Sequence, residues 1–371
     1  MNIFLLNFIL MLVEALFLLF IPNNMPGSSK KTIDLKKKAF VVLQCIQWVL
    51  ISSLRADTVG ADTLNYTTIF EMHTELSWKE CFEYFKTYYT NPEYIERFDI
   101  FDFEPGYILF EKLVATIWNN QIFYKFVVSA IFMTSLGCFV YKNSDDPFLA
   151  FLLYCGLFYN MFSLTGYRQV MSVAIGILWS YEYIKQRKFF KFLLLVLLAS
   201  LLHKTTLVFI VFYFLSRKKI TNTYLVCVVI AVAGMIMFRS QLFDLVKGFV
   251  GYEEYGADAG FTQVNFLLMF CLLSILAIWR YPAIMRKTPN AHMYYNGLIL
   301  SAAMIPFAMV SPTAMRLVYD FAFMLMILVP KVFNSFKDKR NATILYVGSI
   351  LIFGFFIATK AFPYEFFWQV S

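Results

Sequence analysis

Five short clusters of polar side chains hold the residues whose types and spacing could do chemistry. Each cluster sets an arginine, a histidine or a carboxylate beside a strongly apolar segment, where a charge is costly and is therefore a candidate for a function. The clusters are Arg55 with Asp62 and Tyr66, Glu104, Arg168 with Gln169, His203 with Lys204, and Arg316 with Tyr319.

These residue types fit chemistry on a phosphate and a sugar. A guanidinium pairs bidentately with phosphate oxygens and stays charged, so the three arginines suit a lipid-linked phosphate or diphosphate. A histidine or carboxylate nearby could take a proton from an attacking hydroxyl. Tyrosines and tryptophans beside acids suit sugars, whose CH faces stack on rings. Together the clusters indicate glycosyl transfer from a lipid diphosphate donor.

Each cluster also has an ordinary structural interpretation. Arg168 and Arg316 could extend to lipid headgroups. His203 could be an interfacial hydrogen-bonding residue, Asp62 part of a Gly-x-Asp turn, and Glu104 an acid that favours a helix dipole. No HExxH, CxxC, P-loop or GxSxG pattern occurs, so we expect no metal and no cofactor. The combination of the clusters, rather than any one of them, favours a function.

Composition places the chain in a membrane. Of its 371 residues, 60% are hydrophobic and 15% are charged, and the mean hydropathy is +0.64. An ordinary soluble domain is about 45–50% apolar and about 25% charged, so soluble and disordered classes are excluded. Five of the six cysteines lie in apolar runs, which argues against a disulfide framework. We expect an all-α, polytopic integral membrane protein with one transmembrane domain over residues 1–371.

Apolar runs predict about twelve transmembrane helices, several of them short, since a spanning helix needs about 20 apolar residues. Segment 106–118 carries Glu111 and Lys112 in its middle, which predicts an interfacial or partly inserted helix. The twelve runs are 3–21, 39–54, 121–141, 147–163, 169–184, 190–203, 205–216, 221–238, 263–280, 293–310, 316–332 and 341–360.

The distribution of Lys and Arg sets the orientation. Segments 30–38, 217–219 and 337–340 are rich in Lys and Arg and are predicted to be cytoplasmic. Two long loops, 55–105 and 239–262, then lie outside, together with all five polar clusters. The first is aromatic-rich and holds eleven acidic and four basic side chains, a net charge of −7. The basic balance elsewhere fits anionic lipid headgroups, and no nucleic-acid partner is expected.

The order and spacing of the clusters resemble the bacterial EpsG-type, Wzy-like polysaccharide polymerases. The similarity runs from about residue 40 to 330. The acidic, aromatic stretch 70–103 matches none of the family's motifs. The motifs that carry the resemblance are Arg55-x4-Gly-x-Asp62-x3-Tyr66, Glu104-Pro-Gly-Tyr, Tyr167-Arg168-Gln169, Leu202-His203-Lys204-Thr205 and Arg316-x2-Tyr319.

The resemblance implies a metal-independent, GT-C-like enzyme of the bacterial inner membrane. Such an enzyme joins oligosaccharide repeat units carried on undecaprenyl diphosphate into exopolysaccharide, capsule or O-antigen at the extracytoplasmic face, and a chain-length regulator is a possible partner. Direct displacement by the acceptor hydroxyl would invert the anomeric centre.

The residues are assigned roles on this basis. The assignments are Arg168, Arg316 and Arg55 for the donor diphosphate, His203, Asp62 or Glu104 for the base, and Tyr66, Gln169, Lys204 and Tyr319 for orienting the sugar.

Other functions remain open. A flippase or transporter of the same lipid-linked saccharide would need internal repeats or charges at the bilayer midplane, and neither is evident. A membrane acyltransferase that modifies exported polysaccharide could use His203 with a nearby acid, although the arginines favour a phosphate over a thioester donor. A purely structural assembly protein would leave the polar clusters unexplained.

Overall fold

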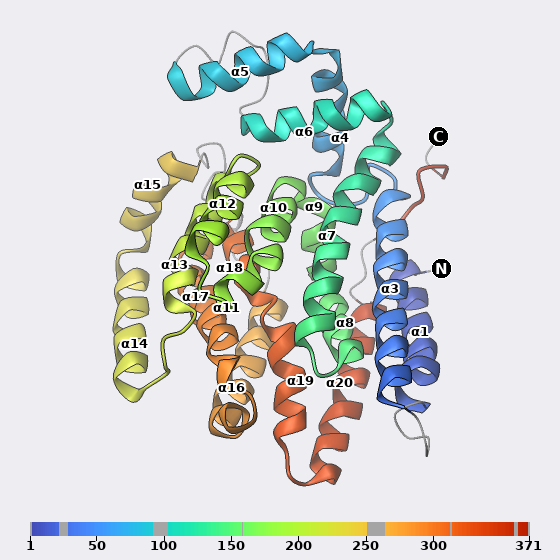
Figure 1. Ribbon diagram of the computed structural model, residues 1–371, viewed down its shortest axis with the longest axis vertical. Helices are drawn as coiled ribbons and strands as arrows, with labels where there is room; N and C mark the ends of the chain where they lie inside the picture. Colours follow the sequence, from blue (N-terminus) through green and yellow to red (C-terminus); the bar gives the residue numbers. More distant parts are fainter. Residues whose placement is uncertain are drawn as a thin grey trace. The chain divides into compact units, whose positions relative to one another are not determined.

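The computed structural model is helical throughout (Figure 1). It describes residues 2–21, 29–91, 103–157, 159–250, 264–311, 314–359 and 363–369. Helices make up 83% of the structure, and the described residues contain no strand. The expected all-α class is therefore confirmed.

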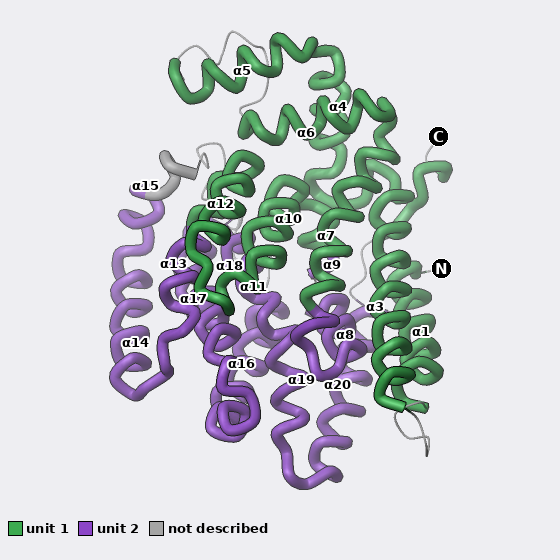
Figure 2. Tube along the Cα trace, in the orientation of Figure 1, with its two compact units in different colours: residues 1–139, 161–207, 360–371 green, residues 140–160, 208–359 purple. Residues whose placement is uncertain are grey.

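The chain divides into two compact units, coloured separately in Figure 2. The first unit comprises residues 1–139, 161–207 and 360–371. Its helices are α1 (Ile3–Ala15), η1 (Leu16–Phe20), α3 (Lys30–Ser53), α4 (Thr63–Glu75), α5 (Trp78–Thr90), α6 (Pro105–Ile117), most of α7 (Gln121–Asn143), most of α9 (Tyr159–Thr165), α10 (Tyr167–Val173), η3 (Ala174–Trp179), α11 (Tyr181–Lys185), α12 (Phe189–Ser200) and η4 (Lys204–Leu207).

The second unit comprises residues 140–160 and 208–359. Its core includes Phe209 and Phe212, which pack against Phe321 with ring centroids 5.3 Å and 5.5 Å away. Its helices are α8 (Pro147–Gly156), α13 (Val208–Leu215), α14 (Asn222–Met237), α15 (Arg239–Val250), α16 (Val264–Lys287), η5 (Pro289–Ala291), α17 (His292–Ala308), α18 (Met315–Ala322), α19 (Leu325–Ser335) and α20 (Lys339–Thr359).

Four helical segments are long and apolar enough to cross a membrane, or up to seven if each of three bent pairs counts as one span. The four are Ile3–Phe20, α7, α16 and α20, and the pairs are α8 with α9, α14 with α15, and α18 with α19. Two shorter apolar helices occur as well. These features fit a polytopic membrane protein. They do not confirm about twelve spans, partly because runs such as 169–184 are divided among α10, η3 and α11.

The segment predicted as a long outer loop, 55–105, contains two helices. Ser77 and Glu80 form a capping box that starts α5. One face of α5 buries Cys81, Tyr84 and Tyr88 against Ile108 of α6. Residues 92–102 of this segment lie outside the described residues, as do 251–262 of the second predicted loop, whose earlier part forms α15.

The helix expected at 106–118 is present as α6, with Pro105 at its first turn. It packs against α4 and α5 rather than standing alone. At Gly106 it approaches the end of α12 so closely that an added Cβ would lie 2.6 Å from both the Cβ and the carbonyl oxygen of Leu201. This contact brings the residue before α6 next to the residues after α12.

Candidate functional site

The Glu104 carboxylate is the centre of a buried polar cluster in the first unit. Its Oε2 accepts a hydrogen bond from Arg168 Nη1 at 2.6 Å. Its Oε1 lies 3.0 Å from both His203 Nδ1 and the backbone nitrogen of Lys204. The Glu104 side chain is only 5% exposed. Residues from three of the five sequence clusters therefore meet at one carboxylate.

Local structure holds the partners of Glu104 in place. His203 ends the turn after α12, and its backbone nitrogen bonds to the Ala199 carbonyl at 3.0 Å. The His203 carbonyl then accepts the Thr206 hydroxyl at 2.6 Å, which ties it to the start of η4. Both ends of the Glu104 contact are thus fixed by helix termini, and the Gly106–Leu201 approach joins them.

Glu104 is a carboxylate at neutral pH. Burial alone would raise the pKa of its carboxyl. The charge and hydrogen bond of His203, the Arg168 guanidinium and the Lys204 N–H outweigh burial and hold that pKa well below its usual range. A carboxylate with so low a pKa is a weak base. Glu104 is therefore better suited to orienting its neighbours than to taking a proton.

The Arg168 guanidinium contacts Glu104, Tyr66 and Phe103 and still has a nitrogen that is unpaired within the described part of the chain. Its Cζ lies 3.8 Å from the centre of the Phe103 ring, and Nη1 bonds to Glu104. Its Nε has no hydrogen-bond partner among the described residues. The side chain is 22% exposed, so the group is reachable from outside the protein. Such a guanidinium can bind an anion without leaving Glu104.

Tyr66 borders the same cluster. Its ring stacks on Tyr167 with centroids 4.8 Å apart and lies 6.0 Å from Phe103. On the other side of the cluster, Lys204 Nζ lies 4.9 Å from the centre of the Tyr88 ring of α5. Gln169 is buried in α10. The predicted residues Tyr66 and Lys204 thus line the site with Glu104, Arg168 and His203.

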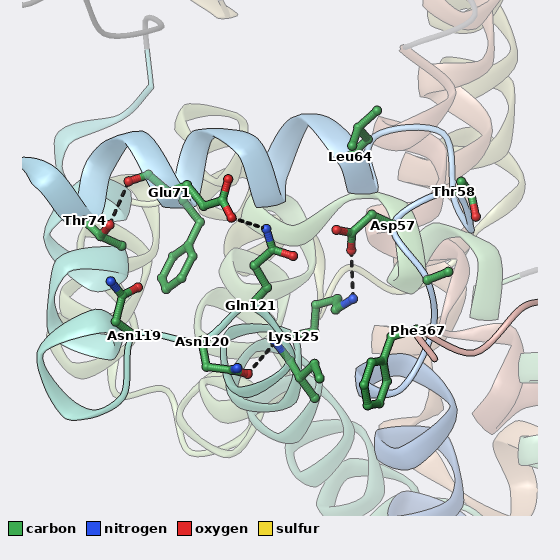
Figure 3. A pocket seen from close by; sticks show the side chains of 13 residues that line it. Asp57, Thr58, Leu64, Glu71, Thr74, Asn119, Asn120, Gln121, Lys125 and Phe367 are labelled. Carbon is green, nitrogen blue, oxygen red and sulfur yellow. Dashed lines mark hydrogen bonds and ion pairs between the residues drawn. The ribbon is translucent and has the colours of Figure 1, made fainter. Parts of the chain in front are cut away.

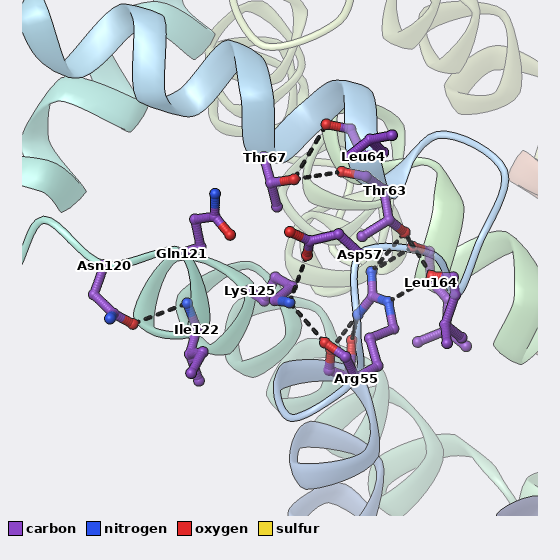
Figure 4. Close-up of polar contacts among 12 residues, drawn as sticks. Arg55, Asp57, Thr63, Leu64, Thr67, Asn120, Gln121, Ile122, Lys125 and Leu164 are labelled. Carbon is purple, nitrogen blue, oxygen red and sulfur yellow. Dashed lines mark hydrogen bonds and ion pairs between the residues drawn. The ribbon is translucent and has the colours of Figure 1, made fainter. Parts of the chain in front are cut away.

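Arg55 lies elsewhere in the same unit and is fully buried. Its guanidinium donates to protein groups on all sides, as Figure 4 shows for several of them. This bonding ties the turn after α3 to the end of α9, and it uses the donors that a phosphate would need. Its acceptors are the carbonyls of Ser52, Val59 and Leu164, and the hydroxyls of Ser52, Thr63 and Tyr167.

The remaining predicted residues are Asp62 of the first unit and Arg316 and Tyr319 of the second. Asp62 is partly exposed at the N-terminal end of α4 and makes no side-chain cap bond there. Arg316 and Tyr319 belong to α18 of the second unit. Tyr319 is buried, with its ring 4.5 Å from Phe266 and 5.7 Å from Tyr159.

A second buried pair, His73 with Glu111, was not predicted. His73 Nδ1 bonds to Glu111 Oε2, and Glu111 Oε1 accepts the Tyr124 hydroxyl at 2.8 Å. Burial raises the pKa of Glu111. Glu111 lies seven residues after Glu104, which places the two acids on the same side of α6. This spacing could have marked Glu111 as a further candidate. In the sequence, Glu111 stands out only as an interruption of an apolar helix.

No group of three or more His, Cys, Asp or Glu side chains that could hold a metal occurs in the part of the chain that the structure describes. Comparison with known proteins gives one match. Residues 38–369 match the family model described as EpsG family, which is a polysaccharide polymerase-type family, and the match includes all five motifs. No curated protein and no solved structure matches the chain.

Proposed function

The chain belongs to the EpsG family, and we propose that it polymerises oligosaccharide repeat units carried on undecaprenyl diphosphate. The reaction is a glycosyl transfer at the extracytoplasmic face of the bacterial inner membrane. The observation that carries the proposal is the Glu104 carboxylate, which holds an arginine and a histidine side by side. These are the two groups that displacement of a diphosphate by a hydroxyl requires.

Arg168 binds the donor diphosphate in this proposal. Negative charge grows on the diphosphate as its bond to the anomeric carbon breaks, and a fixed guanidinium stabilises that charge. Arg168 Nε and the buried Thr205 hydroxyl have no hydrogen-bond partner among the residues described. Buried polar groups are normally satisfied, so such atoms beside a site point to a ligand.

His203 is the general base. When its Nδ1–H is donated to Glu104, the lone pair of the ring lies on Nε2. Nε2 takes the proton of the acceptor hydroxyl while the hydroxyl oxygen bonds to the anomeric carbon and the diphosphate leaves. Direct displacement inverts that carbon. Glu104 is the positioning residue, since it orients the imidazole and stabilises its protonated form. Asp62 is the alternative base.

The other predicted residues take supporting roles. Tyr66, Gln169 and Lys204 orient the saccharide at the Glu104 cluster. Arg316 and Tyr319, which belong to α18 of the second unit, stay predicted ligands of the diphosphate and the saccharide. Arg55, in view of its bonding, positions the turn that precedes α4. The proposed enzyme has a GT-C-like arrangement with about twelve crossings, needs no metal, and has a chain-length regulator as a possible partner.

Reconstitution tests the proposal. The purified protein in liposomes is incubated with lipid-linked repeat units, and the products are separated by size. A ladder of saccharides that is absent with Arg168→Ala supports a polymerase. Acylated units would favour an acyltransferase, and movement of unmodified units across the vesicle membrane would favour a flippase. Either of those results without a ladder contradicts the proposed function.

A further inference from the structure

A polar pocket of about 690 Å³ lies within the first unit (Figure 3). It is formed by α4, the start of α7, the turn after α3 and the C-terminal segment 363–369. None of the residues assigned to the reaction lines it. The lining residues are Ala56, Asp57, Thr58, Leu64, Phe70, Glu71, Thr74, Asn119, Asn120, Gln121, Ile122, Lys125 and Phe367.

Three consecutive amides at the turn before α7 supply donors and acceptors to this pocket. Asn120 Oδ1 accepts the backbone N–H groups of Ile122 and Phe123 at 2.9 Å and 3.0 Å, which fixes the amide plane. Gln121 Nε2 donates to Glu71 Oε1 at 2.6 Å across the pocket. Asn119 is exposed. Beyond these bonds, Asn120 has the N–H donors of its amide and Gln121 has its carbonyl acceptor and a second N–H, which together can bind the hydroxyl groups of a sugar.

An aromatic ring stands at the pocket's edge. Phe367 is 41% exposed, and its ring lies 4.9 Å from that of Trp368. Its backbone nitrogen bonds to the Leu54 carbonyl at 2.9 Å, which holds the C-terminal segment against the turn after α3. An exposed, backbone-anchored ring beside fixed amides can stack on the CH face of a sugar while the amides bind its hydroxyls.

The charges of the pocket disfavour a phosphate. Lys125 Nζ donates to Asp57 at 2.8 Å and to the Arg55 carbonyl at 2.7 Å, so its charge is matched (Figure 4). Glu71 then leaves the lining with a net negative charge. A diphosphate would be repelled here, whereas a neutral saccharide would not.

We propose that this pocket binds a saccharide segment, as a subsite for the sugar chain that the enzyme extends. The inference builds on the proposed function and adds a second place where the same substrate class is held. α4 connects the two places, because Leu64, Glu71 and Thr74 line the pocket while Tyr66 borders the Glu104 cluster. The saccharide is either that of a lipid-linked unit or that of the polymer.

Binding is measured first, with two matched pairs of variants. The probe is the repeat-unit oligosaccharide that mild acid releases from lipid-linked units. Its binding to the full-length protein in nanodiscs is measured by saturation-transfer NMR. Gln121→Ala and Phe367→Ala should each weaken binding roughly tenfold, the loss of one good hydrogen bond or stacking contact. Phe367→Tyr should restore it. Asn65→Ala removes an exposed amide of α4 that does not line the pocket, and should bind as wild type.

Polymerisation is measured next with the same variants. Gln121→Ala and Phe367→Ala should raise the KM for the saccharide and shorten the products while leaving kcat within about twofold. Competition shows which saccharide occupies the pocket. If long released polymer competes better than a single repeat unit, the pocket holds the polymer. If the single unit competes better, the pocket holds the saccharide of the lipid-linked unit. Either result supports a saccharide subsite.

Two outcomes overturn the inference. One is wild-type binding and wild-type product length in both variants, with Asn65→Ala as reference. The other is displacement of the probe by inorganic diphosphate in the Arg168→Ala background, which would make the pocket an anion site. The proposed function is tested separately. If the wild-type protein makes no ladder, the proposed polymerase function is wrong, and the NMR result still decides whether the pocket binds a saccharide.

Discussion

His203 and Glu104 contact each other, yet their chemistry differs. Glu104 is nearly buried and held as a carboxylate by an arginine, an imidazole and a backbone N–H. His203 presents one ring nitrogen to that carboxylate and is itself 9% exposed. The same division of work between an orienting acid and a histidine base occurs in hydrolase triads. Substitution can therefore separate a base from a positioning residue.

We expect His203→Ala to reduce turnover by about 10²–10⁴-fold, the usual contribution of general-base catalysis. His203→Gln should be almost as impaired, because its amide N–H can still donate to the Glu104 carboxylate but the amide cannot take a proton at neutral pH. Initial rates of ladder formation measure both. Near-normal rates with His203→Gln would leave Asp62 as the base.

The pH dependence of stability reports on Glu104. Its pKa is lowered in the folded protein, so the folded state favours the carboxylate more than the unfolded chain does, whose pKa is about 4.3. This stabilisation is complete above that value and is lost as the pH falls below it. The difference in apparent Tm between wild type and Glu104→Gln should shrink as the pH falls below about 4.3. A difference that grows as the pH falls below about 4.3 would contradict the lowered pKa.

Two arginines that look alike in the sequence should respond differently to lysine. Arg168→Lys keeps the charge but loses the planar fork, so activity should fall at least about tenfold with little change in Tm. Arg55→Lys leaves buried acceptors such as the Leu164 carbonyl unpaired, and each such loss costs about 1–3 kcal/mol. Arg55→Lys should therefore lower the Tm clearly. A thermal denaturation series beside the ladder assay measures both, and the reverse pattern would exchange the two roles.

At the scale of elements, α6 and the end of α12 form the frame of the site. Gly106→Ala places a Cβ 2.6 Å from Leu201, so α6 must shift away and separate Glu104 from His203. We expect a drop in activity of roughly tenfold or more, because small displacements of catalytic groups are costly. Gly234→Ala in α14 meets nothing within 4 Å and is the matched control. Equal activity of the two variants would argue against this frame.

The sequence predicted several parts of this frame and missed others, for physical reasons. The charged residues Glu104, Arg168 and His203 stand out because apolar surroundings make charge costly. Their meeting depends on the Gly106–Leu201 approach, which no spacing along the chain reveals. The helices α4 and α5 were missed because their buried faces contain many polar or weakly apolar residues within an acidic stretch, which conceals the helical period. The buried face of α5 is cysteine and tyrosine, and that of α4 includes threonine and histidine. The number of spans differs where bends and short helices divide an apolar run.

At the scale of the whole molecule, the charge distribution predicts which segments face the cytoplasm. Lys218 and Lys339 lie in basic segments at helix ends and are exposed, as is Glu83 on α5. If the positive-inside rule orients the chain, Lys218 and Lys339 face the cytoplasm and Glu83 faces outside. The Glu104 cluster, which contacts α5 through Lys204 and Tyr88, then also faces outside.

Single cysteines on a background without the six native ones test this orientation. In intact cells, Glu83→Cys should react with a membrane-impermeant maleimide, whereas Lys218→Cys and Lys339→Cys should react only after permeabilisation. All three side chains are exposed, so lack of labelling reflects the membrane and not the fold. If Glu83→Cys labels only in permeabilised cells, the cluster faces the cytoplasm. A lipid-linked substrate that has already crossed the membrane could not then reach Arg168.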